Sequence, residues 1–565
     1  MQIQSISRLF AFRAGIVAAT AVALGGDAGA QAAKADLILV NGNVYTVDGA
    51  HPRASAFAVR NGRIVFVGSD REARFLAGSA TRVIDARGQT VIPGMVDAHA
   101  HLLGLGTSLR NVKLAGSRTY DEVIARVAER AKTAKPGEWI IGRGWDQNLW
   151  PEKKFPTHEA LTRAIPNNPV VLTRIDGHAL LANAMAMKAA GITAATRDPE
   201  GGRIERNADR SPSGVFVDNA ENLVNRVIPA ATREQTRAAI LAAIAEANKW
   251  GLVGIHDAGA SRRTIDIYES LAREGRYNLR NFVLVSGDSG SVNHYLSVGP
   301  RSALYGGHLW VRSIKLYSDG ALGSRGAALL APYSDDRDNT GLIVTPPAEI
   351  QRIATSGLRR GFQIAVHAIG DRGNRIVLDA YDAALRAVPT VDHRFRVEHA
   401  QVISPTDIPR FARMGVIPSM QASHQTSDMP WAETRVGPER IKGAYAWRSL
   451  INTGVIIPNG SDFPVEEVNP LISFHSAVSR QDATNSPPGG WYPAEAMTRE
   501  EALKAMTIWP AYAGFQEKAM GSITPGKYAD FVILDRDIMT VPAAEILGTK
   551  VVSTWIGGVA VYTRR

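Results

Sequence analysis

The chain has 565 residues, 45% of them hydrophobic and 21% charged, with a net charge of +10. This is an ordinary globular composition, and the basic residues are spread along the chain without a long run, which argues against nucleic-acid binding. There is no cysteine, so disulfides, thiolate metal sites and cysteine nucleophiles are excluded, and any metal must be held by histidine, carboxylate or modified lysine.

Residues 1–30 have the pattern of a secretory signal peptide. Arg8 and Arg13 precede an apolar stretch over 14–24, and the small residues 28–30 offer a cleavage site before Gln31. The alternative is an uncleaved anchor, but the apolar run is about half of what spans a bilayer. We therefore expect export, to a periplasm or to the outside, and no stable membrane association after the signal is removed.

Short β-like runs mark both ends of the remaining chain. They fill residues 36–92, separated by Asn-Gly and Asp-Gly turn signals, and return within 518–565. Because chain ends often lie close together, the sequence predicts that 36–92 and 518–565 form one composite β-sandwich domain.

Between these ends, residues 93–517 alternate apolar strands with helical segments, which is typical of an α/β fold of the TIM-type (β/α)₈ barrel class. Amphipathic helices are expected at 232–250 and 349–360. The expected barrel strands are 93–98, 252–256, 281–286, 311–317, 362–367, 395–400, 416–420 and 455–460.

The gap between the first two strands is too long for a simple crossover, whose loops normally run about 2–6 residues. It contains strand-like runs of its own, at 139–142 and 170–173. Residues 110–245 are therefore predicted to form a compact insertion beside the barrel mouth.

The sharpest local signal is the His99-Ala-His101 pair at the end of the first barrel strand. Residues two apart on a strand point to the same side, so both imidazoles can face the barrel axis at the end where barrel active sites are built. By itself such a pair is open to a purely structural interpretation.

Three further strands also end in an imidazole or a carboxylate. His367 follows 362–366, His399 ends 395–399, and Asp462 follows 455–461. Four strands that deliver ligand-type side chains to one end of a barrel indicate a metal site.

These motifs resemble the amidohydrolase superfamily, and within it the family 3 branch that includes N-substituted formamide deformylases. The likeness extends over nearly the whole mature chain and is specific for family but not for substrate. It includes Gly142-Arg-Gly-Trp-Asp-Gln, Asp176-Gly-His-Ala, His256-Asp-Ala-Gly, Ile314-Lys-Leu-Tyr-Ser-Asp-Gly, His367-Ala-Ile-Gly-Asp, Glu398-His-Ala, Gly460-Ser-Asp-Phe-Pro-Val and Gly521-Ser-Ile-Thr-Pro-Gly-Lys.

The resemblance implies a centre of one or two divalent ions, with zinc the default and manganese, iron or cobalt compatible with the same ligands. It implies that His99 and His101 hold the more buried ion and His367 and His399 the more exposed one. Lys315 corresponds to a lysine that many members carboxylate on its side-chain nitrogen, so that it can bridge two ions. The alternative is an ordinary charged lysine beside a one-metal site.

By the same resemblance Asp462 belongs to the metal-binding set, contacts the metal-bound water and acts as general acid and base. Weaker candidates for substrate binding are Trp145, Asp146, His178, His256 and Asp319. His178 and His256 could instead support turns, Asp319 could support Lys315, and Trp145 could belong to the insertion's core rather than to an aromatic wall at the mouth.

The leading functional hypothesis is hydrolysis of a C–N bond in an amide-like small molecule, such as an N-acyl, N-formyl or cyclic amide. Hydrolysis of an ester, lactone or carbamate in the same site is the second hypothesis, because all pass through a tetrahedral intermediate. The third is an inactive barrel that serves as a periplasmic binding or regulatory protein. The partner is then a small molecule, and a homo-oligomer is compatible with the sequence.

Overall fold

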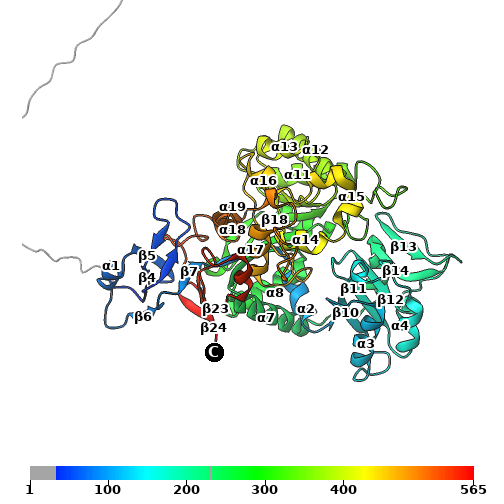
Figure 1. Ribbon diagram of the computed structural model, residues 1–565, viewed down its shortest axis with the longest axis horizontal. Coiled ribbons are helices and arrows are strands. Elements are labelled where there is room, and N and C mark those ends of the chain that lie inside the picture. The colour runs from blue at the N-terminus through cyan, green and yellow to red at the C-terminus, as the bar shows by residue number, and fades with distance from the viewer. Residues whose placement is uncertain (1–33, 230) are drawn as a thin grey trace, which may run out of the picture.

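The computed structural model describes residues 34–229 and 231–565. The predicted signal peptide, residues 1–30, lies outside the described residues. No described helix is long and apolar enough to span a bilayer. In Figure 1 the described chain forms three parts in a row, with sheets from the two chain ends on one side, a barrel in the middle and a separate sheet on the other side.

The central part is a barrel of parallel strands. Seven named strands pair in the order β21-β20-β19-β18-β16-β15-β8 among the described residues, and every pairing along that path is parallel. They are β8 (Met95–Ala100), β15 (Leu252–Ala260), β16 (Arg280–Ser286), β18 (Leu309–Tyr317), β19 (Gln363–Ala368), β20 (Arg396–His399) and β21 (Ile417–Ser419).

The prediction of a regular eighth strand at 455–460 is wrong. One parallel bridge joins Asn459 to Met420, and the Ala98 amide donates to the Asn459 carbonyl at 3.2 Å. This segment therefore closes the barrel between β21 and β8, but Pro458 has no amide hydrogen to donate to a ladder.

Helices cover the outside of the barrel and pack on its apolar core. The expected helix at 232–250 is α7 (Arg233–Lys249), whose Thr232 and Gln235 form a reciprocal capping box. The expected helix at 349–360 is α11 (Pro347–Arg360), which ends at Gly361 in the left-handed conformation. The main further helices are α2 (Leu102–Ser108), α8 (Arg262–Arg273), α9 (Ser289–Val298), α12 (Asp371–Ala387), α13 (Ile408–Met414), α14 (Ala422–Asp428), α15 (Ala432–Arg440), α17 (Pro470–Ser479) and α18 (Arg499–Ala505).

Between β8 and α7 the chain forms a separate mixed sheet with strand order β13-β14-β12-β11-β10-β9. The predicted boundary at 245 lies inside α7, and α7 packs on α2, where a Cβ at Gly106 would meet the Ala239 carbonyl. The strands are β9 (Val112–Lys113), β10 (Ile140–Trp145), β11 (Val170–Arg174), β12 (Ala179–Ala182), β13 (Gly202–Arg206) and β14 (Pro212–Asp218), flanked by α3 (Tyr120–Ala131), α4 (His158–Ala164) and α5 (Ala184–Ala189).

Strands from both chain ends share one sheet. β7 (Thr90–Pro93) pairs antiparallel with β22 (Phe531–Leu534) in the order β24-β23-β22-β7-β2-β3, and a second sheet has the order β5-β4-β1-β6. Phe57 and Phe531 meet edge to face at 5.0 Å between ring centres, within an apolar core common to the two sheets. The remaining strands are β1 (Leu37–Val40), β2 (Asn43–Tyr45), β3 (Arg53–Ala54), β4 (Ala56–Arg60), β5 (Arg63–Gly68), β6 (Arg82–Asp85), β23 (Val551–Ile556) and β24 (Val559–Thr563).

Candidate metal centre

Two histidines at the end of β8 meet Asp462 at the barrel axis. The Asp462 Oδ1 lies 3.0 Å from the His101 Nε2 and 3.6 Å from the His99 Nε2. Asp462 has a φ of 60°, a left-handed conformation that is uncommon for a residue with a side chain and is frequent at functional sites. The Asp462 amide donates to the His99 carbonyl at 2.7 Å. Backbone pairing thus fixes the carboxylate against the two imidazoles.

Asp97 ties the segment before Asp462 to β8. Its carboxylate accepts hydrogen bonds from the Ser461 hydroxyl at 2.6 Å and the Ser461 amide at 3.1 Å. The backbone at Gly460 lies so close to β8 that a Cβ on this residue would be only 2.4 Å from the His99 backbone nitrogen. Sequence analysis did not single out Asp97, although it lies two residues before His99 on the same strand.

His367 and His399, at the ends of β19 and β20, lie beside this pair. Their ring centres are 4.6 Å apart, and His399 lies 4.9 Å from His99. The His399 Nδ1 is 2.7 Å from the Gln421 Oε1, and the His367 Nε2 is 3.3 Å from the Gly320 carbonyl. One nitrogen of each ring is held by the protein, which leaves the other as a candidate ligand.

His424 also belongs to this cluster and was missed by sequence analysis. It lies on α14, directly after β21, and its ring stacks on His399 with centres 5.7 Å apart. Its Nε2 is 3.7 Å from the Asp462 Oδ2. The signal was available, because His424 stands four residues beyond the expected strand 416–420, at the same end of the barrel.

The donor set fits a divalent cation. Two groups of side chains bring their ligand atoms within 4.8 Å of one another, namely His99, His101 and Asp462, and His399, His424 and Asp462. The Nε2 atoms of His99 and His424 are buried without a hydrogen-bond partner among the described residues. Buried polar atoms are normally paired, so these two nitrogens are suited to an ion, and imidazole with carboxylate is a ligand set that zinc and similar metals accept.

The local electrostatics keep these ligands in their metal-binding protonation states. Burial lowers the pKa of His99 to about 4, with the Lys315 charge adding to the effect, and burial also lowers the pKa values of His367 and His399. Burial alone would raise the pKa of Asp462, but the surrounding imidazoles hold it well below its usual value. The centre therefore offers neutral imidazoles and an ionised carboxylate, the forms that bind metal.

Lys315, near the end of β18, is 1% exposed and points into the same space. Its Nζ lies 4.1 Å from the centre of the Tyr317 ring, and it forms no ion pair with a carboxylate among the described residues. Asp319 lines the cavity but forms no ion pair with Lys315 among the described residues. Instead it accepts the amides of Ile369 and Gly370 and lies 3.6 Å from the His367 Nε2.

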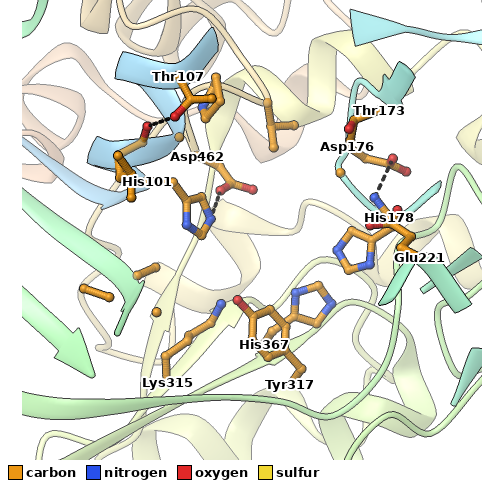
Figure 2. A pocket seen from close by; sticks show the side chains of 18 of the residues that line it. His101, Thr107, Thr173, Asp176, His178, Glu221, Lys315, Tyr317, His367 and Asp462 are labelled. Atoms are coloured by element: carbon orange, nitrogen blue, oxygen red, sulfur yellow. Dashed lines mark hydrogen bonds and ion pairs between the residues drawn. The ribbon is translucent and has the colours of Figure 1, made fainter. Parts of the chain in front are cut away.

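A cavity of about 780 Å³ opens over the cluster. Figure 2 shows His101, Asp462, Lys315 and His367 on one side, with His178 and Glu221, from segments next to the strands of the separate sheet, across from them. The His178 Nδ1 is 2.7 Å from the Asp218 Oδ1, and this contact raises the pKa of His178 to about 9 although burial opposes it. His178 thus reaches the cavity from the insertion.

Three of the weaker candidates lie elsewhere. His256 is fully buried behind the cavity, where the Arg396 guanidinium donates to its Nδ1 at 2.7 Å. Trp145 lies in the core of the separate sheet and donates to the Leu172 carbonyl, so it forms no wall at the mouth. Asp146 caps a short turn and pairs with Arg174 beside a second cavity.

Residues 82–562, most of the chain, match the amidohydrolase family. The chain belongs to the amidohydrolase family. The predicted family, the α/β barrel fold and the hydrolase class are thereby confirmed.

Individual relatives of this amidohydrolase cover almost all of it. It is 33% identical over 544 residues to Protein LONG AFTER FAR-RED 3 of Arabidopsis thaliana, across 94% of this chain and 92% of that protein. It is 30% identical over 551 residues to the N-substituted formamide deformylase of Arthrobacter pascens, across 94% of this chain and 98% of that protein. The structure of an uncharacterized metal-dependent hydrolase from Pyrococcus horikoshii superimposes with a TM-score of 0.73 at 27% identity, covering 90% of this chain and 99% of the other.

Proposed function

We propose that this amidohydrolase cleaves the C–N bond of an amide-like small molecule, an N-formyl, N-acyl or cyclic amide, at a centre of one or two divalent ions, with zinc as the first candidate. The observation that carries the proposal is the set of imidazoles gathered around Asp462, two of which have a buried nitrogen without a partner among the described residues. The similarity to an N-substituted formamide deformylase supports an amide as the substrate.

A bound divalent ion acidifies water from a pKa of about 15.7 towards 7 and polarises a carbonyl. Asp462 lies between the two imidazole groups, where it can accept the proton of the attacking water as the water oxygen bonds to the carbonyl carbon. The same carboxyl then delivers that proton to the nitrogen as the C–N bond breaks, so that amide and water give carboxylic acid and amine. His99, His101, His367, His399 and His424 would hold the ion, and His178 lines the cavity wall that faces them.

Carboxylation of Lys315 is part of the proposal. A buried ammonium without a carboxylate partner is costly, and it repels a cation. A carbamate on the Lys315 Nζ is anionic and offers two oxygens to the same space. Mass spectrometry of the intact native protein, or a ¹³C label supplied as bicarbonate, tests for this carbamate.

The test of the function combines metal content with turnover. We expect purified protein to contain a divalent metal, to hydrolyse N-formylbenzylamine to formate and benzylamine, and to lose this activity on chelation. The Asp462→Asn variant should lose about 10²–10⁴-fold in kcat because proton transfer is removed. Its metal content should stay close to that of the wild type.

The matched control is Asp338→Asn, at an exposed position away from the cavity. It should behave like the wild type. Full activity in the Asp462→Asn variant, or in thoroughly chelated protein, would contradict the proposal.

A further inference from the structure

Tyr317 lies at the end of β18, two residues after Lys315, so the two side chains point to the same side of the strand. In the pairing of β18 with β19, Tyr317 stands opposite His367, and the centres of their rings are 5.5 Å apart. The Lys315 Nζ lies 4.1 Å from the centre of the Tyr317 ring. The phenol ring therefore packs beside two of the side chains assigned to the metal centre.

The hydroxyl group of Tyr317 extends across the barrel mouth from β18 towards β15, two strands away. A Cβ at Gly259, near the end of β15, would lie 3.4 Å from this hydroxyl oxygen. Tyr317 lines the cavity over the metal centre, and Figure 2 shows its hydroxyl pointing into that space beside the Lys315 amino group. Among the described residues nothing forms a hydrogen bond with it. The phenol thus offers an unused hydrogen-bond donor to a molecule in the cavity.

The other hydroxyl groups on the barrel side of this cavity are already engaged. Tyr268 donates to the Asp257 carboxylate at 2.6 Å. The rest bond to carbonyls within α2 or to each other, and they belong to Thr107, Ser108, Ser261 and Thr264. The Thr173 hydroxyl also has no partner among the described residues, but it belongs to β11 of the separate sheet, across the cavity. In the described lining, Tyr317 therefore supplies the unengaged hydroxyl that lies next to the metal ligands.

Amide hydrolysis needs a donor of this kind. When water attacks the carbonyl carbon, negative charge develops on the carbonyl oxygen, and a preorganised hydrogen-bond donor stabilises that charge. The donor must stand beside the groups that hold the metal and must not be occupied by a protein acceptor. The Tyr317 hydroxyl meets both conditions.

We propose that the Tyr317 hydroxyl donates a hydrogen bond to the substrate carbonyl oxygen and stabilises it as the oxyanion of the tetrahedral intermediate. The phenol keeps its proton throughout, and Asp462 carries the proton of the attacking water to the leaving nitrogen. Tyr317 is thereby a catalytic residue, and this role rests on the proposed function.

The Tyr317→Phe substitution tests the role, because it keeps the ring beside Lys315 and His367 and removes only the hydroxyl. Loss of one oxyanion donor typically costs about 10²–10³-fold in kcat. We expect a loss of about 100-fold with N-formylbenzylamine, since the metal ion stabilises the same charge. The KM should change by less than about threefold, because the hydrogen bond is strongest in the transition state. Metal content and stability in urea should stay at wild-type values.

Tyr512→Phe is the matched control. The Tyr512 side chain is 40% exposed, lies outside the cavity lining and has no hydrogen bond to its hydroxyl among the described residues. It should keep the wild-type kcat. If the Tyr317 ring serves only to support its neighbours, Tyr317→Phe should also keep the wild-type kcat, which would overturn the proposal. A loss of kcat that follows a loss of metal would overturn it too, because the hydroxyl would then support the ligands rather than the substrate.

Binding of 2-phenylethylphosphinate provides a readout that does not require turnover. In this analogue of the tetrahedral intermediate, phosphorus replaces the carbonyl carbon and a methylene replaces the nitrogen. Calorimetry with metal-loaded protein should show binding at least about tenfold weaker in Tyr317→Phe than in the wild type, because hydrogen bonds to a charged oxygen are strong. Benzylamine, which lacks the charged oxygens, should bind both proteins equally.

The two readouts separate this proposal from the proposed function. Weaker phosphinate binding in Tyr317→Phe without hydrolysis of the formamide by the wild type upholds Tyr317 as an oxyanion donor and overturns amide hydrolysis. Equal phosphinate binding by both proteins, or no binding by either, overturns the role of Tyr317 whatever the turnover. Formamide hydrolysis at equal rates in both proteins overturns the role of Tyr317 and upholds the proposed function.

Discussion

At the scale of single residues, the metal centre depends on a buried charge pair beneath it. Glu398 contacts the His99 Nδ1 at 2.5 Å, and the Arg396 guanidinium in turn binds Glu398 and the Ser419 hydroxyl. Burial would raise the pKa of Glu398, but Arg396 and His99 lower it to about 2, so it stays ionised. A carboxylate on the rear nitrogen of a ligand imidazole fixes the tautomer and orients the ring.

The Glu398→Gln substitution tests this positioning role. Loss of such a carboxylate typically weakens metal binding by about 10–100-fold, and we expect this range here. Competition with a chromogenic chelator measures the affinity. Ser419→Ala removes another partner of Arg396 but not the contact with His99, and should change metal affinity far less. Unaltered affinity in Glu398→Gln would show that the carboxylate does not orient His99.

The residue pattern predicts some of this site and not the rest. His99, His101, His367, His399 and Asp462 stand at or just after strand ends, and the barrel brings those ends together. His424 lies within α14, four residues beyond the expected strand 416–420, so a search limited to the residues at the strand ends does not reach it. For His256 the motif is misleading in the other direction. It indicates a site residue, but Arg396 holds the His256 ring behind the cavity.

At the scale of elements, the segment before Asp462 positions the metal centre although few backbone hydrogen bonds pair it with the barrel strands. Residues 455–460 form no regular strand, yet Gly460 lies against β8 and its amide donates to the Met420 carbonyl at 3.0 Å. The sequence predicted a strand here because residues 455–457 are a β-branched apolar run. It could not show that Pro458 breaks the ladder while the segment still closes the barrel.

The Gly460→Ala substitution tests this close approach. The added Cβ would lie 2.4 Å from the His99 backbone nitrogen, with little room to move because Asp97 holds Ser461. Overpacking of this kind typically costs about 1–3 kcal/mol. We expect lower stability in urea and metal content below half of the wild type.

Gly49→Ala is the matched control, because a Cβ at Gly49 meets nothing within 4 Å. It should fold and bind metal like the wild type. Normal metal content in Gly460→Ala would mean that β8 and the Asp462 segment can shift apart without harm to the site.

At the scale of the whole molecule, long-range pairing joins the parts that the sequence keeps far apart. Turn signals and β-branched runs predicted strands at both chain ends, and the structure pairs β7 with β22. The separate sheet between β8 and α7 was expected as a compact insertion with strand-like runs at 139–142 and 170–173, and β10 and β11 lie at those runs. Its strand order, and the contact of His178 with Asp218 at the cavity, depend on tertiary packing that no local pattern encodes.

One buried ion pair connects the barrel to the sheet of the chain ends. Arg280 of β16 donates through its Nη2 to the Asp530 Oδ1 at 2.8 Å and through its Nε to the Oδ2, and both side chains are at most 3% exposed. The Gly557 amide donates to the same carboxylate. Asp530 thus accepts hydrogen bonds both from a barrel strand, through Arg280, and from the turn between β23 and β24, through Gly557.

Replacing Asp530 with asparagine should therefore loosen the whole assembly rather than the active site alone. Removing one partner of a buried pair leaves the other charge uncompensated and typically costs about 3–5 kcal/mol. Urea unfolding should show this loss, with the end sheets detaching first, whereas Glu129→Gln, in an exposed pair, should change stability by less than about 1 kcal/mol. Below the onset of unfolding, metal content should stay normal, because no ligand comes from the end sheets. A small effect of Asp530→Asn would mean that the apolar contacts between barrel and sheet hold the two together without the ion pair.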